Sequence, residues 1–171
     1  VLGNFVEIGV HHGNYIPAIK TMMLPGSKLY LFDTFTGIPD KDVVLPEEEP
    51  FREEFAEIGS GMTADEIKRL GEIPGAVLVQ GDIAETLDSG LPDRITFAHV
   101  DVDTYAGTIL SLMKVHPKMI EGGRISVHDY ANPSTPGVRV AIEEFNGEHS
   151  ESYDHEIRPD DHYVYLRKAQ R

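Results

Sequence analysis

The stretch that decides the fold is Asn4–Gly13, which reads NFVEIGVHHG. A short apolar run ends at Gly9, a polar turn with two histidines follows, and Gly13 closes the turn. A helical pattern near Tyr15–Met23 begins directly afterwards and ends at a proline-glycine pair. Glycines at such a turn let the backbone approach a ligand, and the following helix N-terminus favours a negatively charged group. Two glycines alone fit a plain tight turn equally well.

The rest of the chain repeats this alternation of short apolar runs and helical segments. With the first strand extending over Asn4–Val10, alternation of this kind predicts an α/β fold. We expect a single doubly wound, mostly parallel, Rossmann-like sheet with a C-terminal antiparallel hairpin. Gly122 and Gly123 are expected to end the predicted helix Thr108–Ile120. The further predicted strands are Lys28–Phe32, Ala76–Gln80, Ile95–Val100 and Arg124–Val127, the helices are Ile83–Leu87, Thr108–Ile120 and Gly137–Phe145, and the hairpin joins Tyr153–Ile157 to His162–Leu166 around Pro159–Asp161.

Residues 1–171 are enough for one domain with a real core. An insertion over residues 34–75 interrupts the alternation directly after the second strand, where either a substrate-covering lid or an ordinary surface excursion fits. Within it we expect short helices at Phe51–Ile58 and Ala64–Leu70, and an exposed loop at Glu47–Glu49 between two prolines. The chain opens close to a strand and lacks an initiator Met, so we expect further residues upstream.

Composition excludes several classes of protein. The formal net charge is −14, from 29 acidic residues against 15 Lys and Arg, which argues against nucleic acid or an anionic membrane as a partner. The absence of Cys excludes disulfides, thiolate metal sites and thiol nucleophiles, and it agrees with a reducing compartment. No apolar run approaches the roughly 20 residues that span a bilayer, and no signal peptide is visible. The sequence therefore predicts a cytoplasmic protein.

A carboxylate at the end of the second strand points to an adenosine-type ligand. Asp33 lies 20 residues beyond Gly13, the spacing at which an acid accepts hydrogen bonds from ribose hydroxyls. We expect Asp33→Ala to weaken ligand binding without disturbing the fold. Asp82, after the third strand, fits either the adenine amino group or the N-cap of the following helix. A third glycine is missing from the turn, which disfavours a dinucleotide.

Two further strand ends carry acids and a histidine. Asp101 and Asp103 follow the fourth strand, and His128 and Asp129 follow the fifth. Carboxyl ends of neighbouring parallel strands meet at one edge of the sheet, and clustered carboxylates favour a cation or a shared proton. Oxygen-rich ligation suits Mg²⁺ or Ca²⁺, and an imidazole also admits Mn²⁺ or Fe²⁺. The alternative is that these acids only cap helices and face solvent.

Four blocks of the sequence resemble the macrocin O-methyltransferase family, whose members are class I methyltransferases of antibiotic-sugar biosynthesis. They are Phe5–Val10, Leu31–Pro39, His99–Tyr105 and His128–Tyr130, the last followed by a Pro-Gly-Val segment. The blocks occur in the family's order and span nearly the whole chain. The Phe-Asp-Thr-Phe and Asp-Val-Asp segments are specific, whereas the glycine turn is shared by many methyltransferases.

The resemblance implies S-adenosylmethionine as methyl donor and a divalent cation, usually Mg²⁺, that holds the acceptor hydroxyls. By position, Asp101 and Asp129 match metal ligands, His128 stands where the family often has another Asp, and Asp103 matches the proposed general base. The residues expected to bind the methyl donor are Glu7, Gly9, Gly13, Asp33, Thr34, Asp82 and Asp101.

The sequence therefore predicts an S-adenosylmethionine-dependent, divalent-metal-assisted O-methyltransferase. Its acceptor is a hydroxyl of a small molecule, and a sugar of a natural product is one candidate. A nicotinamide-dependent oxidoreductase is disfavoured by the missing third glycine and by the absence of a Tyr-x-x-x-Lys pair. The same residues also admit a non-catalytic S-adenosylmethionine-binding protein or a metal-dependent hydrolase. The acceptor and the oligomeric state, a homo-oligomer included, stay open.

Overall fold

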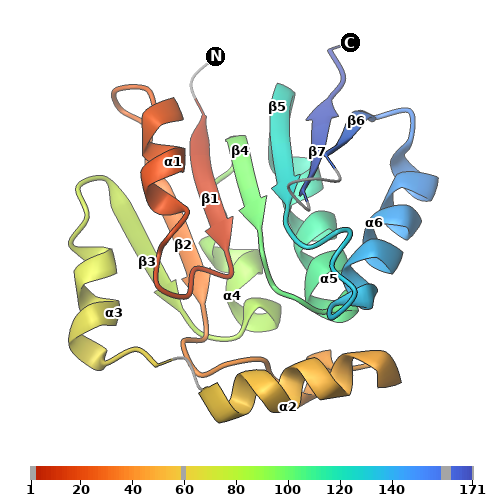
Figure 1. The fold of residues 1–171 in the computed structure, drawn as a ribbon. Coiled ribbons are helices and arrows are strands. Elements are labelled where there is room, and N and C mark those ends of the chain that lie inside the picture. The colour runs from red at the N-terminus through yellow and green to blue at the C-terminus, as the bar shows by residue number, and fades with distance from the viewer. Residues whose placement is uncertain (1–2, 59–60, 159–162, 171) are drawn as a thin grey trace.

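The structure, a computed structural model, describes residues 3–58, 61–158 and 163–170. These residues form a seven-stranded sheet in the order β3-β2-β1-β4-β5-β7-β6 (Figure 1). Strands β1 to β5 are mutually parallel, and β7 and β6 form an antiparallel pair at one edge. This confirms the predicted fold class. The strands are β1 (Asn4–Ile8), β2 (Leu29–Asp33), β3 (Ala76–Gln80), β4 (Ile95–Val100), β5 (Met119–Val127), β6 (Tyr153–Arg158) and β7 (Tyr163–Lys168).

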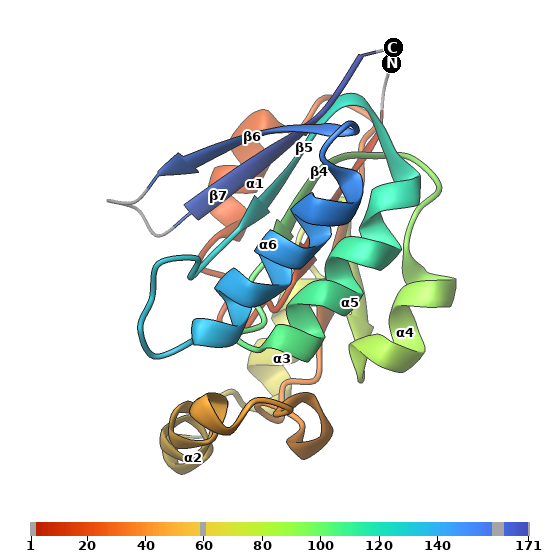
Figure 2. The same cartoon turned by 90° about the vertical axis from the view of Figure 1, so that its right-hand side faces the viewer.

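Helices cover both faces of the sheet. Figure 2 shows α4, α5 and α6 side by side on one face, with α1 on the other. Within the described residues, no helix is both long and apolar enough to cross a bilayer. The α-helices are α1 (Ile16–Met22), α2 (Glu49–Ile58), α3 (Ala64–Gly71), α4 (Ile83–Gly90), α5 (Tyr105–Val115) and α6 (Pro136–His149), and the short 3₁₀ helices are η1 (Asp40–Asp42), η2 (Pro46–Glu48) and η3 (His116–Lys118).

Two apolar clusters, one on each face of the sheet, form the core. The larger lies under α4, α5 and α6 and contains Val6 and Ile8 of β1. The smaller contains Phe5 of β1 and joins α1 and α3 to the sheet. Alternate residues of a strand point to opposite faces, so β1 supplies both clusters and has to be apolar almost throughout. That is why the run at the start of the sequence identifies the central strand.

The order in which strands are added to the sheet reverses at β1, since β2 and β3 lie on one side of it and β4 and β5 on the other. Strand β1 pairs with β2 on one side and with β4 on the other, so a crevice opens between β1 and β4 at their carboxyl ends. Glu7 lies in register with Leu31 of β2 and His99 of β4. Figure 1 shows α2 lying across the carboxyl ends of the parallel strands. The fold thus places the insertion over the crevice where ligands bind in such sheets.

The prediction for the segment after α5 is wrong. The helix ends at Val115, not near residue 120, and Gly122 and Gly123 lie inside β5. Pro117 lies in the tight turn of η3 that follows the helix. The register between β4 and β5 shifts where the two glycines lie, and a Cβ on Gly123 would meet Met119 and backbone oxygens at 2.8–3.1 Å. The glycine pair therefore serves an irregularity in a strand, where close backbone approach requires it.

The insertion contains both predicted helices, but its acidic turn is not an exposed loop. Residues 46–48 form η2, and α2 begins at Glu49, earlier than predicted. Glu47 is exposed, whereas Glu48 is only 2% exposed. Its carboxylate accepts hydrogen bonds from the amides of Leu45 and Tyr105. A tertiary contact with the start of α5 therefore buries a carboxylate that its sequence neighbours suggest is solvated.

The C-terminal hairpin is confirmed, since β6 and β7 pair in antiparallel fashion and β7 continues the sheet beside β5. The predicted turn around Pro159–Asp161, together with His162, lies outside the described residues. Strand β1 is shorter than predicted because Gly9 turns the chain out of the sheet with a φ of 81°.

A histidine pair links η3, which follows α5, to the last residue of α6. Figure 2 shows the C-terminal ends of α5 and α6 on the side of the molecule away from α2. The rings of His116 and His149 stack with their centroids 4.4 Å apart, and Nδ1 of His116 lies 3.0 Å from the Tyr153 hydroxyl. Lys168 donates to the carbonyl of His116. Burial, His149 and Lys168 together lower the pKa of His116.

This pair should make stability fall in mild acid. Because the pKa of His116 is lower in the folded chain than its ordinary value of about 6.5, the unfolded chain takes up the proton first. The contribution of the neutral imidazole is thus complete above about pH 6.5 and is lost as the pH falls. We expect the melting temperature of His116→Asn to fall less steeply than that of the wild type between about pH 7.5 and 5.5. If the melting temperatures of the two proteins fall equally with pH, His116 does not contribute to the loss of stability in acid.

Candidate active site

The glycine turn after β1 is shaped by a close approach of two backbones. Gly9 has a φ of 81°, and a Cβ there would lie 1.8 Å from the carbonyl oxygen of Asp101. No side chain fits in that space, so glycine is required where the ends of β1 and β4 meet. Gly13 has a φ of 73°, and a Cβ there would press on Ile16 and Leu70 at 2.9 Å. Its role in the described structure is close packing between the turn, α1 and α3.

Asp33 ties this turn to the end of β2. Its Oδ2 atom accepts hydrogen bonds from the amides of Val10 and His11 at 2.7 and 2.8 Å, and its Oδ1 atom accepts from Phe35 at 2.7 Å. The carboxylate therefore orders the loop that faces the cavity. Because three backbone donors would lose their acceptor, we now expect Asp33→Ala to loosen this turn as well as to weaken ligand binding.

Glu7 is a buried acid in the middle of the crevice. The residue is 1% exposed, and its Oε2 atom has no hydrogen-bond partner among the described residues. Burial, followed by the nearby charges of Asp101 and Asp33, raises the pKa of Glu7 to about 8. A carboxyl group in this state carries a proton at neutral pH and offers one polar atom that is free for a ligand.

A cavity of about 550 Å³ opens at the carboxyl ends of the strands. Its wall combines the glycine turn with the acids that follow β4 and β5, so the sequence-predicted groups are brought together in one space. The predicted residues that line it are Glu7, Gly9, Asp33, Thr34, Asp101, Asp103, His128 and Asp129. Gly13 does not line it, and Asp82 lines a neighbouring hollow with Gly81 and residues 36–40 of the insertion.

Asp82 caps α4, as one of its two predicted roles requires. Its Oδ1 atom accepts from the amide of Ala84 at 2.8 Å, and its Oδ2 atom lies 3.0 Å from Nζ of Lys41. Lys41 also contacts Asp42 at 2.8 Å, so one ammonium group links the insertion to the start of α4.

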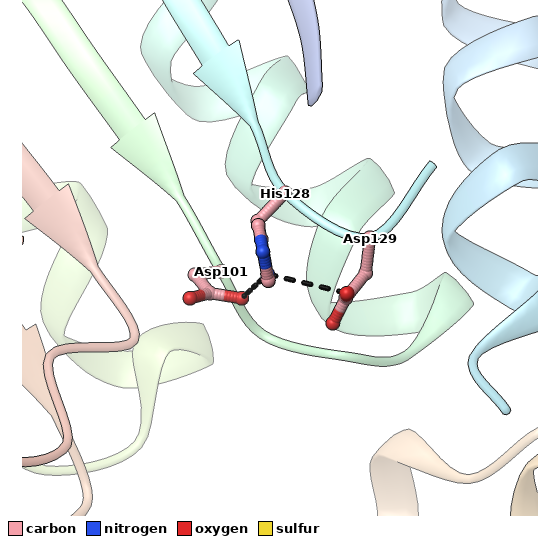
Figure 3. Close-up of side chains that lie close together, drawn as sticks. All are labelled: Asp101, His128 and Asp129. Atoms are coloured by element: carbon pink, nitrogen blue, oxygen red, sulfur yellow. Dashed lines mark hydrogen bonds and ion pairs between the residues drawn. The ribbon is translucent and has the colours of Figure 1, made fainter. Parts of the chain in front are cut away.

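Three side chains at the ends of β4 and β5 form a candidate metal centre. Ligand atoms of Asp101, His128 and Asp129 lie within 4.8 Å of one another in the described chain. Figure 3 shows the imidazole between the two carboxylates, with His128 Nδ1 3.1 Å from Asp101 Oδ1 and 3.2 Å from Asp129 Oδ1. Hydrogen bonds to these two carboxylates raise the pKa of His128 to about 10. Two carboxylates and one imidazole form a donor set that suits Mg²⁺, Mn²⁺ or Fe²⁺.

Asp103 lies beside this cluster but is not one of its three members. Its backbone adopts a left-handed φ of 62°, and burial, with the charges of Asp101 and Asp129, raises the pKa of its carboxyl group. A hydrogen bond links the Asp103 and Asp129 side chains. The helix α5 is capped by Thr104, whose hydroxyl accepts from Gly107, so Asp103 does not serve as that cap.

The family follows from a comparison with known proteins. The macrocin-O-methyltransferase family model matches residues 1–168. The chain belongs to the macrocin-O-methyltransferase family. This confirms the resemblance seen in the sequence and with it the prediction of an S-adenosylmethionine-dependent methyltransferase, so a nicotinamide-dependent oxidoreductase is no longer an alternative. No curated protein matches the chain in sequence.

Solved structures agree with the macrocin-O-methyltransferase fold. The O-methyltransferase NovP superimposes with a TM-score of 0.82 at 22% identity, and the match covers 99% of this chain and 73% of NovP. CalS11, a TDP-rhamnose 3′-O-methyltransferase of calicheamicin biosynthesis, has a TM-score of 0.67 at 24% identity, with coverages of 98% and 72%. At these identities the two likenesses show the fold.

Sequence reasoning missed the aromatic wall of this methyltransferase cavity. Phe51 and Phe55 of α2 line it, and their rings stack 6.1 Å apart. Tyr15 and Tyr163 also line the cavity. The ring of Tyr15 stacks on that of His99 with the centroids 3.8 Å apart, and the ring centroids of Tyr163 and His128 are 4.7 Å apart. No local motif distinguishes these rings from core residues. The one available signal was the placement of the insertion directly after β2, which brings α2 over the strand ends.

Proposed function

We propose that this chain is a divalent-metal-assisted O-methyltransferase that transfers the methyl group of S-adenosylmethionine to a hydroxyl of a sugar-like small molecule. The observation that carries the proposal is the single cavity in which the glycine turn adjoins the acids and histidine at the ends of β4 and β5. The activities of NovP and CalS11, both O-methyltransferases, support the reaction type, and the rhamnose acceptor of CalS11 supports the acceptor class.

The methyl-donor site is proposed on the β1 and β2 side of the cavity. Asp33 orders the glycine turn and presents its carboxylate to the ribose, while Gly9 keeps the turn free of side-chain atoms. The free polar atom of Glu7 suits a donor group of the ligand. Asp82, which pairs with Lys41, borders the hollow where the adenine would lie. Thr34 and Asp101, which line the cavity, stay part of this proposal, whereas Gly13 would act only through the packing of the turn. When bound, S-adenosylmethionine supplies a sulfonium methyl group with an excellent leaving group.

The acceptor site is proposed on the β4 and β5 side. Asp101, His128 and Asp129 would hold a divalent cation, Mg²⁺ or Mn²⁺, which lowers the pKa of a bound hydroxyl. Asp103 is the proposed general base, because it lies beside the cluster without belonging to it and its raised pKa favours proton uptake. Phe51 and Phe55 close the cavity from the insertion and limit water at the reacting atoms.

The wider setting of the activity belongs to the same proposal. Residues 1–171 would act as one domain, with the insertion over residues 34–75 as a lid. A cytoplasmic location and independence of nucleic acids and membranes remain predictions from the sequence, and the oligomeric state, a homo-oligomer included, stays open. The experiment for the proposed function is release of S-adenosylhomocysteine with Mg²⁺ and a panel of deoxysugar nucleotides and glycosides. Binding of S-adenosylmethionine without turnover on any hydroxyl acceptor would favour a non-catalytic binding protein.

Asp33→Ala should weaken binding of S-adenosylmethionine by roughly 1–3 kcal/mol, because a charge-assisted acceptor is lost and its donors remain unpaired. Asp33→Asn is the matched variant, since its amide oxygen still accepts while its NH₂ group meets the amides of the turn as a donor. We expect both variants to bind more weakly in calorimetry and to melt at a lower temperature than the wild type. Unchanged affinity in both would remove Asp33 from the methyl-donor site.

A further inference from the structure

Glu48 connects the insertion to the two helices that follow the acid-bearing strands. Its Oε1 atom accepts a hydrogen bond from the amide of Tyr105, 57 residues away, and its Oε2 atom accepts from Leu45 at 3.2 Å. Tyr105 is the first residue of α5, where the amide has no partner within the helix. A carboxylate is favoured there by the positive end of the helix dipole.

The same carboxylate fills a space that a glycine leaves at the start of α6. A Cβ on Gly137 would lie 1.9 Å from Oε1 of Glu48 and 2.8 Å from the amide of Tyr105. The φ of Gly137 is not in the left-handed region, so backbone conformation does not require glycine there. Contact with Glu48 does require it. Three segments far apart in the sequence, at η2, α5 and α6, therefore meet at one carboxylate.

On one side this contact holds the end of the segment that carries Asp103. The chain makes a tight turn after β4, in which Asp103 is left-handed and the amide of Thr104 donates to the carbonyl of Val102 at 2.7 Å. The next amide, that of Tyr105, is the one that Glu48 holds. The turn is thus fixed on both sides of Thr104, and the direction of the Asp103 side chain depends on it.

On the other side, Glu48 directly precedes α2, the helix of the proposed lid. Helix α2 begins at Glu49, and its Phe51 and Phe55 line the cavity. Figure 1 shows α2 across the strand ends. We propose that Glu48 is a positioning residue that docks α2 over the cavity and orients Asp103 with one buried carboxylate. The proposal rests on the proposed function, because it assigns Asp103 to the reaction.

The first test compares Glu48→Ala and Glu48→Gln with Glu47→Ala. Glu47 is the exposed neighbour, so its variant controls for a change of charge in the same turn. We expect Glu48→Ala to lower kcat/KM by roughly 10- to 100-fold through both a lower kcat and a higher acceptor KM, as expected for misplaced reacting groups. The Gln variant should recover part of the loss, because its oxygen still accepts from Tyr105. The affinity for S-adenosylmethionine should stay unchanged in all three.

A readout independent of activity is amide hydrogen exchange. In Glu48→Ala, peptides covering residues 45–55 and the start of α5 should lose protection, while those of β1 and β2 keep it. Gly137→Ala should produce the same pattern without altering any acid, because its methyl group would occupy the place of the Glu48 carboxylate. In the double variant Glu48→Ala with Gly137→Ala, the Gly137 change should cause a smaller further loss of protection than it causes in the wild type.

The outcomes separate this proposal from the function on which it rests. An active wild type with unchanged kinetics and exchange in Glu48→Ala and Gly137→Ala would overturn the role of Glu48 and leave the methyltransferase assignment intact. A uniform loss of protection across the sheet in both variants would also overturn it, since Glu48 would then support the whole fold. A wild type without methyl transfer, but with the local exchange pattern, would overturn the proposed function and retain the anchor.

Discussion

Asp103→Asn should lower the rate of methyl transfer by about 10²–10⁴-fold, the usual contribution of a general base, at every metal concentration. An amide has the size and shape of the carboxyl group, but it cannot take the acceptor's proton. The left-handed backbone of Asp103 is also one that Asn tolerates, so the local turn should be retained. Steady-state rates over a metal titration, with folding checked by thermal melting, provide the measurement.

The pH dependence of the methyl-transfer rate gives a second test of Asp103 as the general base. Burial and the neighbouring acids raise the pKa of Asp103, and a base works only after it has lost its proton. The wild-type rate should therefore rise with pH through the raised pKa, and this acidic limb should be missing in Asp103→Asn. Asp101→Asn is the contrast, because loss of a ligand should weaken metal affinity and be partly reversed by excess metal. Rescue of Asp103→Asn by metal would instead make Asp103 a ligand.

Removal of divalent metal by EDTA should reduce turnover by at least about 10²-fold, since a cation at such a site supplies several kcal/mol of charge stabilisation. Added Mg²⁺ should restore the rate, and Mn²⁺ should do so too because His128 supplies a nitrogen ligand. Binding of S-adenosylmethionine should survive chelation, because only Asp101 among the groups proposed for it is also a proposed metal ligand. Full turnover in excess EDTA would end the metal hypothesis and leave the methyltransferase assignment standing.

Metal affinity should also rise with pH. Without a cation, the two carboxylates raise the pKa of His128 to about 10, so the imidazole carries a proton at neutral pH. Only the neutral ring coordinates a metal, and binding therefore displaces one proton from His128 below about pH 10. Calorimetry in buffers of different ionisation heats should detect this release. If no proton is released, His128 stays an imidazolium that offsets one of the two carboxylate charges, and His128 is not a metal ligand.

The fold was predictable where local pattern decides the structure. Strands β3 and β4 begin and end where predicted, because each is a short, mostly apolar run bounded by glycine or charged residues. The meeting of the acids at the strand ends was also predictable, because neighbouring parallel strands have their carboxyl ends at the same edge of the sheet. The spacing of Asp33 from the glycine turn likewise follows from the length of a strand-helix-strand unit.

Tertiary contacts decided what the sequence could not show. Glu48 stands among prolines and acids, a pattern typical of a solvated loop, and its partner Tyr105 is 57 residues away. Gly122 and Gly123 are typical of a helix end, but they serve a register shift between β4 and β5 that no local pattern contains. Phe51 and Phe55 become part of the cavity only because α2 crosses the strand ends. In each case the deciding partner lies far away in the sequence.

We propose that the cavity lined by the acid cluster binds S-adenosylmethionine. Isothermal titration of the purified chain with S-adenosylmethionine, S-adenosylhomocysteine and NAD tests it most directly. We predict saturable, one-to-one binding of the first two ligands, with or without metal, and no heat from NAD. Binding of NAD without binding of S-adenosylmethionine, or no binding of either sulfur ligand to the folded chain, would contradict it.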